Sequence, residues 1–197
     1  MPAIPTKFDA NLVLIGGRGC GKSSLAKRLA RRNKNFILFS LDALIRYEAG
    51  AATIPEIVAE RGWPGFRDLE FAVVEKVSRF PHSALLDCGG GVVVDLDAQG
   101  QETFSARKVD ALRRHGMIVY LRRDPGYLMR RIANDPNRPP LSDEASFLEI
   151  MERRDPWYRD AADLVLECGE RSKEELAEEI LRWFVARAES RTSSSPR

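Results

Sequence analysis

The residues best suited to chemistry lie near the amino terminus, at positions 16–23, where the sequence reads GGRGCGKS. This run satisfies the pattern G-x-x-x-x-G-K-[ST], with an apolar segment before it and helical spacing after it. Glycines allow a tight turn whose backbone N–H groups converge on an anion, and the positive end of the following helix adds to the attraction. The run therefore predicts a phosphate-binding loop. The alternative is a glycine-rich turn that binds nothing.

Two side chains of this loop would complete a nucleotide site. Lys22 would bridge the outer phosphates, and the Ser23 hydroxyl would ligate Mg²⁺ directly. No Asn-Lys-x-Asp segment for reading guanine occurs later in the sequence, which argues against a GTPase, and the size of the chain favours a small kinase. The residues that we expect to bind the nucleotide are Gly19, Cys20, Gly21, Lys22, Ser23 and Ser24.

Four further stretches contain charges or glycines that folding alone does not require. SLDALIRYEAG contains Asp42, and ERGWPGFRDLE contains Arg67 and Glu70. LLDCGGGVV has three consecutive glycines directly after an apolar run. NRPPL contains Arg138 and precedes MERRDPWYRDAAD, which contains Arg154. In a parallel sheet, ligands bind beyond the carboxyl ends of the strands, where several of these stretches are expected.

Each of these residues also has a purely structural explanation. Asp42 could cap the helix that it begins. Arg67 and Glu70 have the spacing of an i,i+3 surface pair. One of Arg153 and Arg154 is expected to be a solvated residue near a helix end, and the glycines could form a flexible turn. Arg138, before two prolines, could belong to a stiff loop without a catalytic role.

In combination and order, these segments resemble the shikimate kinase family from about residue 11 to about residue 184. The resemblance implies Mg²⁺-dependent transfer of the γ-phosphoryl group of ATP to the 3-hydroxyl of shikimate. It implies catalytic roles for Lys22, Asp42 and Arg138, with Asp42 as base or orienter of the hydroxyl and Arg138 in a mobile lid at about 135–143. The implied shikimate-binding residues are Asp42, Arg67, Gly89, Gly90, Gly91 and Arg154, and Arg131, Arg138 and Arg171 would join the ATP site.

The chain departs from the family pattern after the second expected strand. Relatives usually carry two acidic residues there, separated by one position, and the first helps to organise Mg²⁺ through water; here that position is Ser40. Asp87 ends the next apolar run, where relatives usually have a small or hydroxylated residue. We hypothesise that Asp87 takes over the outer-shell role. The alternative is that Asp87 caps the glycine turn.

Short apolar runs alternate with helical patterns along the chain, which predicts a parallel sheet covered by helices on both faces. The fold class is therefore α/β, a three-layer α/β/α P-loop kinase fold with a central parallel sheet of five strands. The strands are expected at 11–15, 36–39, 83–87, 117–121 and 163–167. The helices are expected at 22–32, 54–61, 67–79, 126–134, 144–154 and 173–188.

Composition limits the class of protein further. With 197 residues, 44% of them hydrophobic, the chain fits one domain, expected at 11–188 between flexible tails at 1–10 and 189–197. The net charge of +2 offers no footprint for nucleic acid or an anionic membrane. Three widely spaced cysteines and the lack of a signal-like segment predict a cytoplasmic protein, and we expect a monomer.

Two other functions remain open at this point. Another small-metabolite kinase, such as a gluconate kinase, would also bind a carboxylate and hydroxyls, although the arginines and the three glycines argue against it. A non-catalytic shikimate kinase-like protein that binds a ligand is conceivable because of Ser40. The presence of Lys22, Asp42 and Arg138 together argues for chemistry, since binding alone does not require all three.

Overall fold

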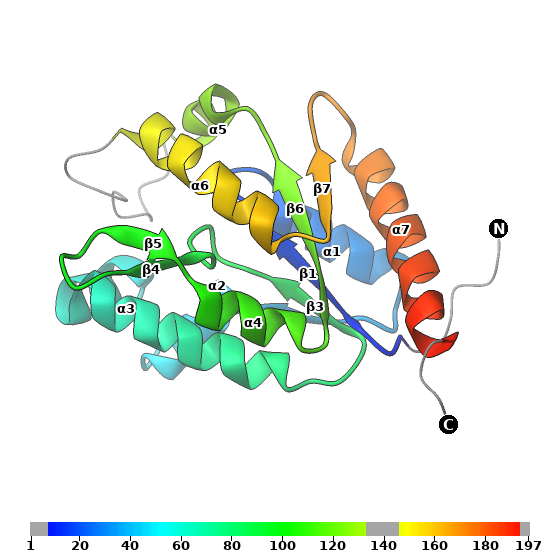
Figure 1. The fold of residues 1–197 in the computed structure, drawn as a ribbon, viewed down its shortest axis with the longest axis horizontal. Helices are drawn as coiled ribbons and strands as arrows, with labels where there is room; N and C mark the ends of the chain where they lie inside the picture. The colour runs from blue at the N-terminus through cyan, green and yellow to red at the C-terminus, as the bar shows by residue number, and fades with distance from the viewer. Residues whose placement is uncertain (1–7, 133–145, 194–197) are drawn as a thin grey trace.

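The computed structural model describes residues 8–132 and 146–193 of the protein. Its centre is a five-stranded sheet in the order β2-β3-β1-β6-β7, with every neighbouring pair parallel (Figure 1). The strands are β1 (Asn11–Ile15), β2 (Ile37–Ser40), β3 (Ala84–Asp87), β6 (Gly116–Arg122) and β7 (Leu164–Glu167). The five strands agree with the predicted runs to within one residue at every end, and the predicted fold class is confirmed.

Helices cover both faces of this sheet. They are α1 (Lys22–Arg32), α2 (Leu41–Glu48), α3 (Ile54–Ser78), α4 (Ala106–Arg113), α5 (Pro125–Ile132), α6 (Phe147–Ala161) and α7 (Lys173–Ser193). In Figure 1, α1 and α7 lie on one side of the sheet and α3 and α4 on the other. The outcome is the three-layer arrangement expected from alternating strands and helices.

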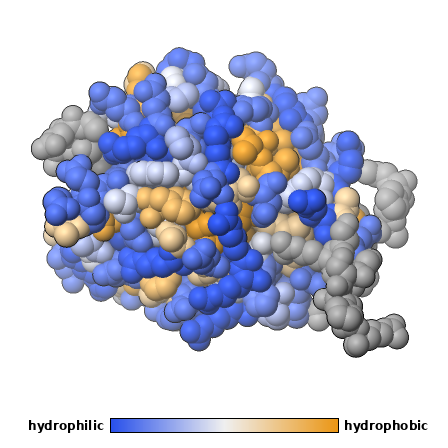
Figure 2. Space-filling model, viewed as in Figure 1, coloured by the Kyte–Doolittle hydropathy of each residue, from blue (hydrophilic) through white to orange (hydrophobic). Residues whose placement is uncertain are grey.

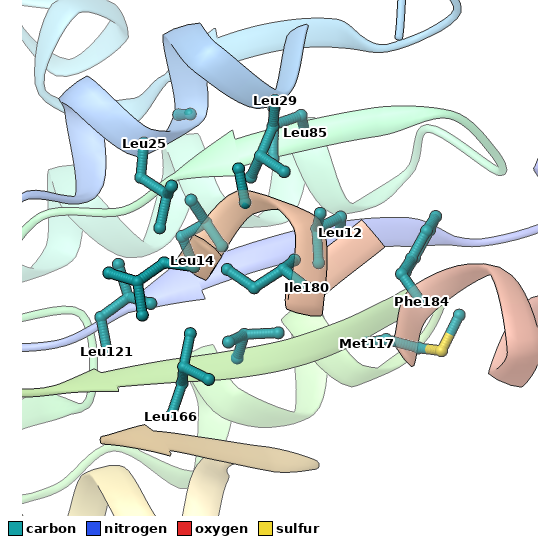
Figure 3. Packing of buried hydrophobic residues seen from close by; sticks show 14 of the residues in the cluster. Leu12, Leu14, Leu25, Leu29, Leu85, Met117, Leu121, Leu166, Ile180 and Phe184 are labelled. Atoms are coloured by element: carbon teal, nitrogen blue, oxygen red, sulfur yellow. The ribbon is translucent and has the colours of Figure 1, made fainter. Parts of the chain in front are cut away.

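The side chains of β1 point alternately to the two faces of the sheet, so this short strand contributes to two hydrophobic clusters. Leu12 and Leu14 belong to the cluster that includes α1 and α7, whereas Val13 and Ile15 belong to the cluster with α2, α3 and α4. Figure 3 shows the first cluster, in which Leu12 and Leu14 lie among side chains of both helices. Because side chains alternate across a strand, a central strand buried on both faces must be apolar throughout.

The range of α3 contains two helical segments, as the sequence predicted at 54–61 and 67–79. They are separated at Gly62, where the backbone leaves helical geometry with a φ of 67°. A positive φ is readily adopted by glycine, so Gly62 kinks the element between the two segments. The capping box of Thr53 and Glu56 begins α3.

An antiparallel hairpin was not expected from the sequence. It consists of β4 (Val94–Leu96) and β5 (Glu102–Phe104) and lies between α3 and α6 in Figure 1. The Asp97 carboxylate accepts hydrogen bonds from the backbone N–H groups of Gln99 and Gln101 and so forms the turn. Strands of three residues show too little alternation to be recognised from sequence. The helix α4 that follows was missed as well.

The expected tails need one correction at each end. Phe8 and Ala10 are buried, and the Phe8 ring lies 5.2 Å from that of Phe36 and 5.0 Å from that of Phe184. The amino-terminal segment therefore contributes to the core from Phe8 onward. At the other end α7 continues to Ser193, beyond the boundary expected at 188. Residues 1–7 and 194–197 lie outside the described residues.

Hydrophilic residues cover most of the face seen in Figure 2. Among the helices that the structure describes, none combines the length and the apolar character needed to span a bilayer.

Candidate active site

The loop between β1 and α1 has the geometry of an anion cradle. Gly16, Gly19 and Gly21 have φ values of 142°, 79° and 102°, which favour glycine. A Cβ atom at Gly16 would lie 2.7 Å from the backbone oxygen of Leu121 in the adjacent strand. Helix α1 begins directly after the loop, at Lys22, so its free N–H groups face the loop.

Lys22 is held at the centre of this cradle. Its Nζ atom donates hydrogen bonds to the backbone oxygens of Gly16, at 2.7 Å, and Gly17, at 3.1 Å. Burial acts to lower the pKa of Lys22, but surrounding groups, among them the carboxylates of Asp87 and Asp42, raise the pKa overall. The ammonium group is therefore charged at neutral pH, as neutralising phosphate oxygens requires.

One pocket of about 180 Å³ joins the cradle to residues from other parts of the chain. Asp42, in the first turn of α2, lines it together with Gly90 and Arg131. Ser40 is the N-cap residue of α2, so Asp42 is not the helix cap that the alternative explanation required. The cradle residues that line the pocket are Arg18, Gly19, Gly21, Lys22, Ser23 and Ser24.

The three consecutive glycines lie where two functional side chains and the backbone of the cradle come close. A Cβ at Gly89 would lie 2.8 Å from Asp42 Oδ1, and a Cβ at Gly91 would lie 2.5 Å from Arg67 Nη1. At Gly90 a Cβ would meet the backbone nitrogen of Arg18 at 3.1 Å. Larger residues would displace these groups, so close approach, not flexibility, explains the run.

Arg67 is buried, which excludes the surface pair considered above. Its Nη1 donates to Glu70 Oε2 at 2.8 Å and to the backbone oxygen of Gly91 at 3.3 Å. The guanidinium carbon lies 5.3 Å from the ring centres of both Trp63 and Phe66. The buried Nε has no hydrogen-bond partner among the described residues. A buried donor of this kind suits the carboxylate of a ligand.

Lys108 completes this charged cluster and was not identified from the sequence. The Lys108 side chain is fully buried, and its Nζ donates to Glu70 Oε2 at 2.7 Å. Burial alone would raise the pKa of Glu70, but the charges of Lys108 and Arg67 outweigh it and hold that pKa below its ordinary value. Glu70 is therefore ionised and shared by two cations.

Arg154 approaches the same glycines from α6. It is buried, whereas the neighbouring Arg153 is partly exposed, so the two arginines divide as expected. The Nη1 of Arg154 lies 3.5 Å from the backbone oxygen of Gly90, to which the Tyr158 hydroxyl also donates. The other edge of the guanidinium donates to Glu102 through Nε, at 3.0 Å, and through Nη2. Glu102 was missed because the hairpin that carries it was missed.

The residues expected around the nucleotide base are only partly brought together. Arg131 lines the pocket, and its Nη1 donates to the Tyr127 hydroxyl at 3.2 Å. Arg171 pairs with Glu179 of α7. Arg138 and the expected lid at 135–143 lie outside the described residues.

A metal ion would find few protein ligands here. Ser23 lies in the pocket, and Asp87, at the end of β3, is in register with Ser40 of β2. Within residues 8–132 and 146–193, no group of three His, Cys, Asp or Glu side chains could hold an ion. This donor set fits Mg²⁺, which retains several waters and binds through one or two side chains and substrate phosphates.

Comparisons with known proteins agree with one another. The family model described as shikimate kinase matches residues 18–185. The shikimate kinase of Leptospira biflexa serovar Patoc is 40% identical over 180 residues, covering 91% of this chain and 98% of that protein. A second shikimate kinase, from Pseudomonas putida, is 35% identical over 175 residues, covering 87% and 94% of the two chains.

Solved structures resemble the fold over most of its length. Shikimate kinase from Acinetobacter baumannii in complex with shikimate has a TM-score of 0.76 and 28% identity, covering 90% of this chain and 94% of that one. A gluconokinase from Sinorhizobium meliloti has a TM-score of 0.57 at 16% identity, covering 96% and 99% of the two chains. The gluconokinase likeness extends to the fold alone.

Proposed function

The chain belongs to the shikimate kinase family, and we propose that it transfers the γ-phosphoryl group of ATP to the 3-hydroxyl of shikimate. One observation supports this assignment above the others. The glycines at 89–91 contact Asp42, Arg67 and Arg154, and Gly90 and Asp42 line the same pocket as the phosphate cradle. An acid bound by the two arginines would therefore present a hydroxyl to Asp42 next to the nucleotide phosphates.

Recognition of the acid would rest on the two guanidinium groups. Arg67 offers its unpartnered Nε, and Arg154 offers Nη1, which faces the backbone of Gly90. Charge-assisted hydrogen bonds from guanidinium to carboxylate are about twice as strong as neutral ones. The glycine run lets Asp42 and Arg67 lie against the backbone, because a Cβ at Gly89 or Gly91 would overlap them.

Catalysis would depend on positioning and on neutralisation of charge. Phosphoryl transfer needs little covalent chemistry from the protein, so an aligned hydroxyl and stabilised phosphoryl oxygens carry the rate. Asp42 would accept the hydrogen bond of the attacking hydroxyl, and Lys22 would contact the outer phosphates. Ser23, with Asp87 through water, would hold Mg²⁺, which when bound shields the phosphate charges. We propose that Arg138 adds a further positive charge from the lid.

A coupled ADP-release assay with shikimate, quinate and gluconate in parallel tests the assignment. We expect ATP turnover with shikimate and little without it. Turnover with gluconate alone would support the second kinase that the fold resembles. Binding of shikimate without turnover would indicate a non-catalytic relative.

The cysteines bear on where the protein acts. Cys20, Cys88 and Cys168 are free and buried, as in proteins of a reducing compartment. We propose a cytoplasmic monomer, and sedimentation of the purified protein would test its oligomeric state.

Asp87→Asn should raise the Mg²⁺ concentration needed for half-maximal activity by about tenfold, since one carboxylate in the outer shell is lost. Asp87 is in register with Ser40, so its charge lies on the strand next to the position where relatives have an acid. The measurements are activity against Mg²⁺ concentration and the affinity for ADP with and without Mg²⁺. Asp110→Asn, an exposed change on α4, is the control. An unchanged Mg²⁺ requirement would refute the metal role of Asp87.

Gly91→Ala should raise the KM for shikimate by about tenfold, with the KM for ATP little changed. The added Cβ would overlap Arg67 Nη1 and push the guanidinium from its place. Steady-state kinetics with each substrate varied in turn measures the effect. Gly126→Ala is a suitable control, because there a Cβ would meet only the ends of the Asp124 and Arg130 side chains. Equal KM values for shikimate in the two variants would contradict the prediction.

A further inference from the structure

The hairpin β4–β5 is the part of the structure that the phosphate chemistry does not explain. It is anchored firmly at its base: Lys108 of α4 donates to the backbone oxygen of Val94. Asp95 accepts hydrogen bonds from Ser105 Oγ at 2.7 Å and from Arg107 Nε at 2.8 Å. The hairpin is therefore a fixed platform, and side chains that it carries are held in place relative to α4.

Glu102, the first residue of β5, extends from this platform to α6. Its carboxylate accepts hydrogen bonds from Arg154 Nε, at 3.0 Å, and from Arg154 Nη2. It also accepts one from Arg153 Nη2 at 2.9 Å. The side chain of Glu102 is 12% exposed and that of Arg154 is 1% exposed. The pair with Arg154 is thus largely shielded from water, where a charge-assisted contact is not weakened as it is at a surface.

Because Glu102 binds one edge of the Arg154 guanidinium, only the other edge remains to bind a ligand. Glu102 accepts from Nε and Nη2, so Nη1 is the remaining nitrogen and lies 3.5 Å from the backbone oxygen of Gly90. Gly90 lines the pocket that contains the phosphate cradle. Arg67 reaches the next carbonyl, that of Gly91, at 3.3 Å. The two guanidinium groups therefore meet consecutive carbonyls of one glycine run.

We propose that Glu102 is a positioning residue of the acid site: it holds Arg154 by one edge so that Nη1 is presented to the substrate carboxylate. The inference rests on the proposed function, since it assigns Glu102 to the binding of the acid. Glu102 itself does not touch the reacting atoms. A carboxylate supplied by the hairpin thus orders the arginine before any ligand arrives, which reduces the entropy lost on binding.

Competition between Glu102 and the substrate for Arg154 would change the KM for shikimate in the opposite direction. If Glu102 competed with the substrate for Arg154, its removal would improve binding and lower the KM for shikimate. The geometry favours positioning, because Glu102 approaches from the hairpin and leaves Nη1 on the side of the glycine run. The charges favour positioning as well. Arg153 and Arg154 carry two positive charges against the one negative charge of Glu102, so a positive charge remains for the substrate carboxylate.

Glu102→Gln tests the inference directly. The amide keeps the shape but loses the charge and places an N–H donor against a guanidinium. We expect the KM for shikimate to rise about tenfold, with kcat and the KM for ATP within about twofold of wild type. Glu102→Asp keeps the charge on a shorter side chain and should restore part of the affinity. Arg153→Gln, which removes only the exposed partner of Glu102, should leave the KM for shikimate unchanged.

The outcomes separate this inference from the proposed function. A wild-type protein that does not phosphorylate shikimate would defeat the function itself. With an active wild type, an unchanged or lowered KM in Glu102→Gln would overturn the positioning role. A fall in kcat at saturating substrates as large as the rise in the KM for shikimate would also overturn the positioning role. A general structural defect would then explain the effect. If Glu102→Gln does not fold, Glu102→Ala, which removes the carboxylate, decides, and an unchanged KM for shikimate there defeats the inference.

Discussion

Lys22→Met is expected to lower kcat by about 10³-fold while the protein remains folded. Methionine keeps the aliphatic stem of the buried side chain but removes the ammonium group, which lies within 3.1 Å of the backbone oxygens of Gly16 and Gly17. In the transition state that ammonium would neutralise the phosphate oxygens, a contribution that methionine cannot make. The measurement is kcat at saturating ATP, Mg²⁺ and shikimate.

The control for Lys22→Met lies on the same helix. Lys27 is exposed on α1, so Lys27→Met removes the same charge away from the pocket and should leave kcat within about twofold. Thermal melting of both variants shows whether they are folded. Similar kcat values for Lys22→Met and wild type would mean that phosphoryl transfer does not take place at this loop.

Asp42→Asn is expected to lower kcat by about 10²- to 10³-fold, within the range usual for a general base. The amide has the same size but can no longer accept a proton. Asp42 lines the pocket with Lys22, and its Oδ1 lies where a Cβ at Gly89 would be only 2.8 Å away. The carboxylate thus lies between the cradle and the glycine run, where it would align the attacking hydroxyl of the proposed reaction.

The same helix again supplies a control for this change. Glu48, at the end of α2, forms a surface pair with Lys76, so Glu48→Gln should change kcat by less than twofold. Shikimate binding, followed by intrinsic fluorescence, should weaken far less than kcat in Asp42→Asn. Trp63 is a suitable reporter because it packs against Arg67. Loss of binding with unchanged kcat would assign Asp42 to recognition and not to chemistry.

Local patterns predict the parts of the site that are local in sequence. The cradle at 16–23 is one continuous segment whose glycines have required backbone angles, so the sequence pattern was sufficient. The strands were recognised because central parallel strands are continuous apolar runs. Asp42, Arg67 and Arg154 were placed by resemblance to a family, and the structure brings all three to the same glycines.

The parts that sequence did not predict are pairs between distant segments. Glu102 and Arg154 are separated by 52 positions, and Lys108 and Glu70 by 38. Neither pair has a periodicity or spacing that could be read from the chain. A lysine such as Lys108, within a helical pattern, is usually exposed, and only the packed structure reveals that its ammonium group is paired with Glu70.

These buried charges also explain why the site should respond sharply to single changes. Removing one partner of a buried ion pair leaves the other charged and unpaired, which typically costs about 3–5 kcal/mol. Glu70 is shared by Arg67 and Lys108, so Lys108 supports the position of Arg67 through Glu70. Variants at these positions therefore need stability measurements beside kinetics.

The most direct test of the whole account is a crystal structure of the protein with ADP, Mg²⁺ and shikimate. The account predicts the shikimate carboxylate within hydrogen-bonding distance of Arg67 and of Arg154 Nη1, and the 3-hydroxyl next to Asp42, facing the nucleotide phosphates. Glu102 should remain bound to Nε and Nη2 of Arg154. Shikimate bound away from the glycines at 89–91, or with its 3-hydroxyl directed away from the cradle, would contradict it.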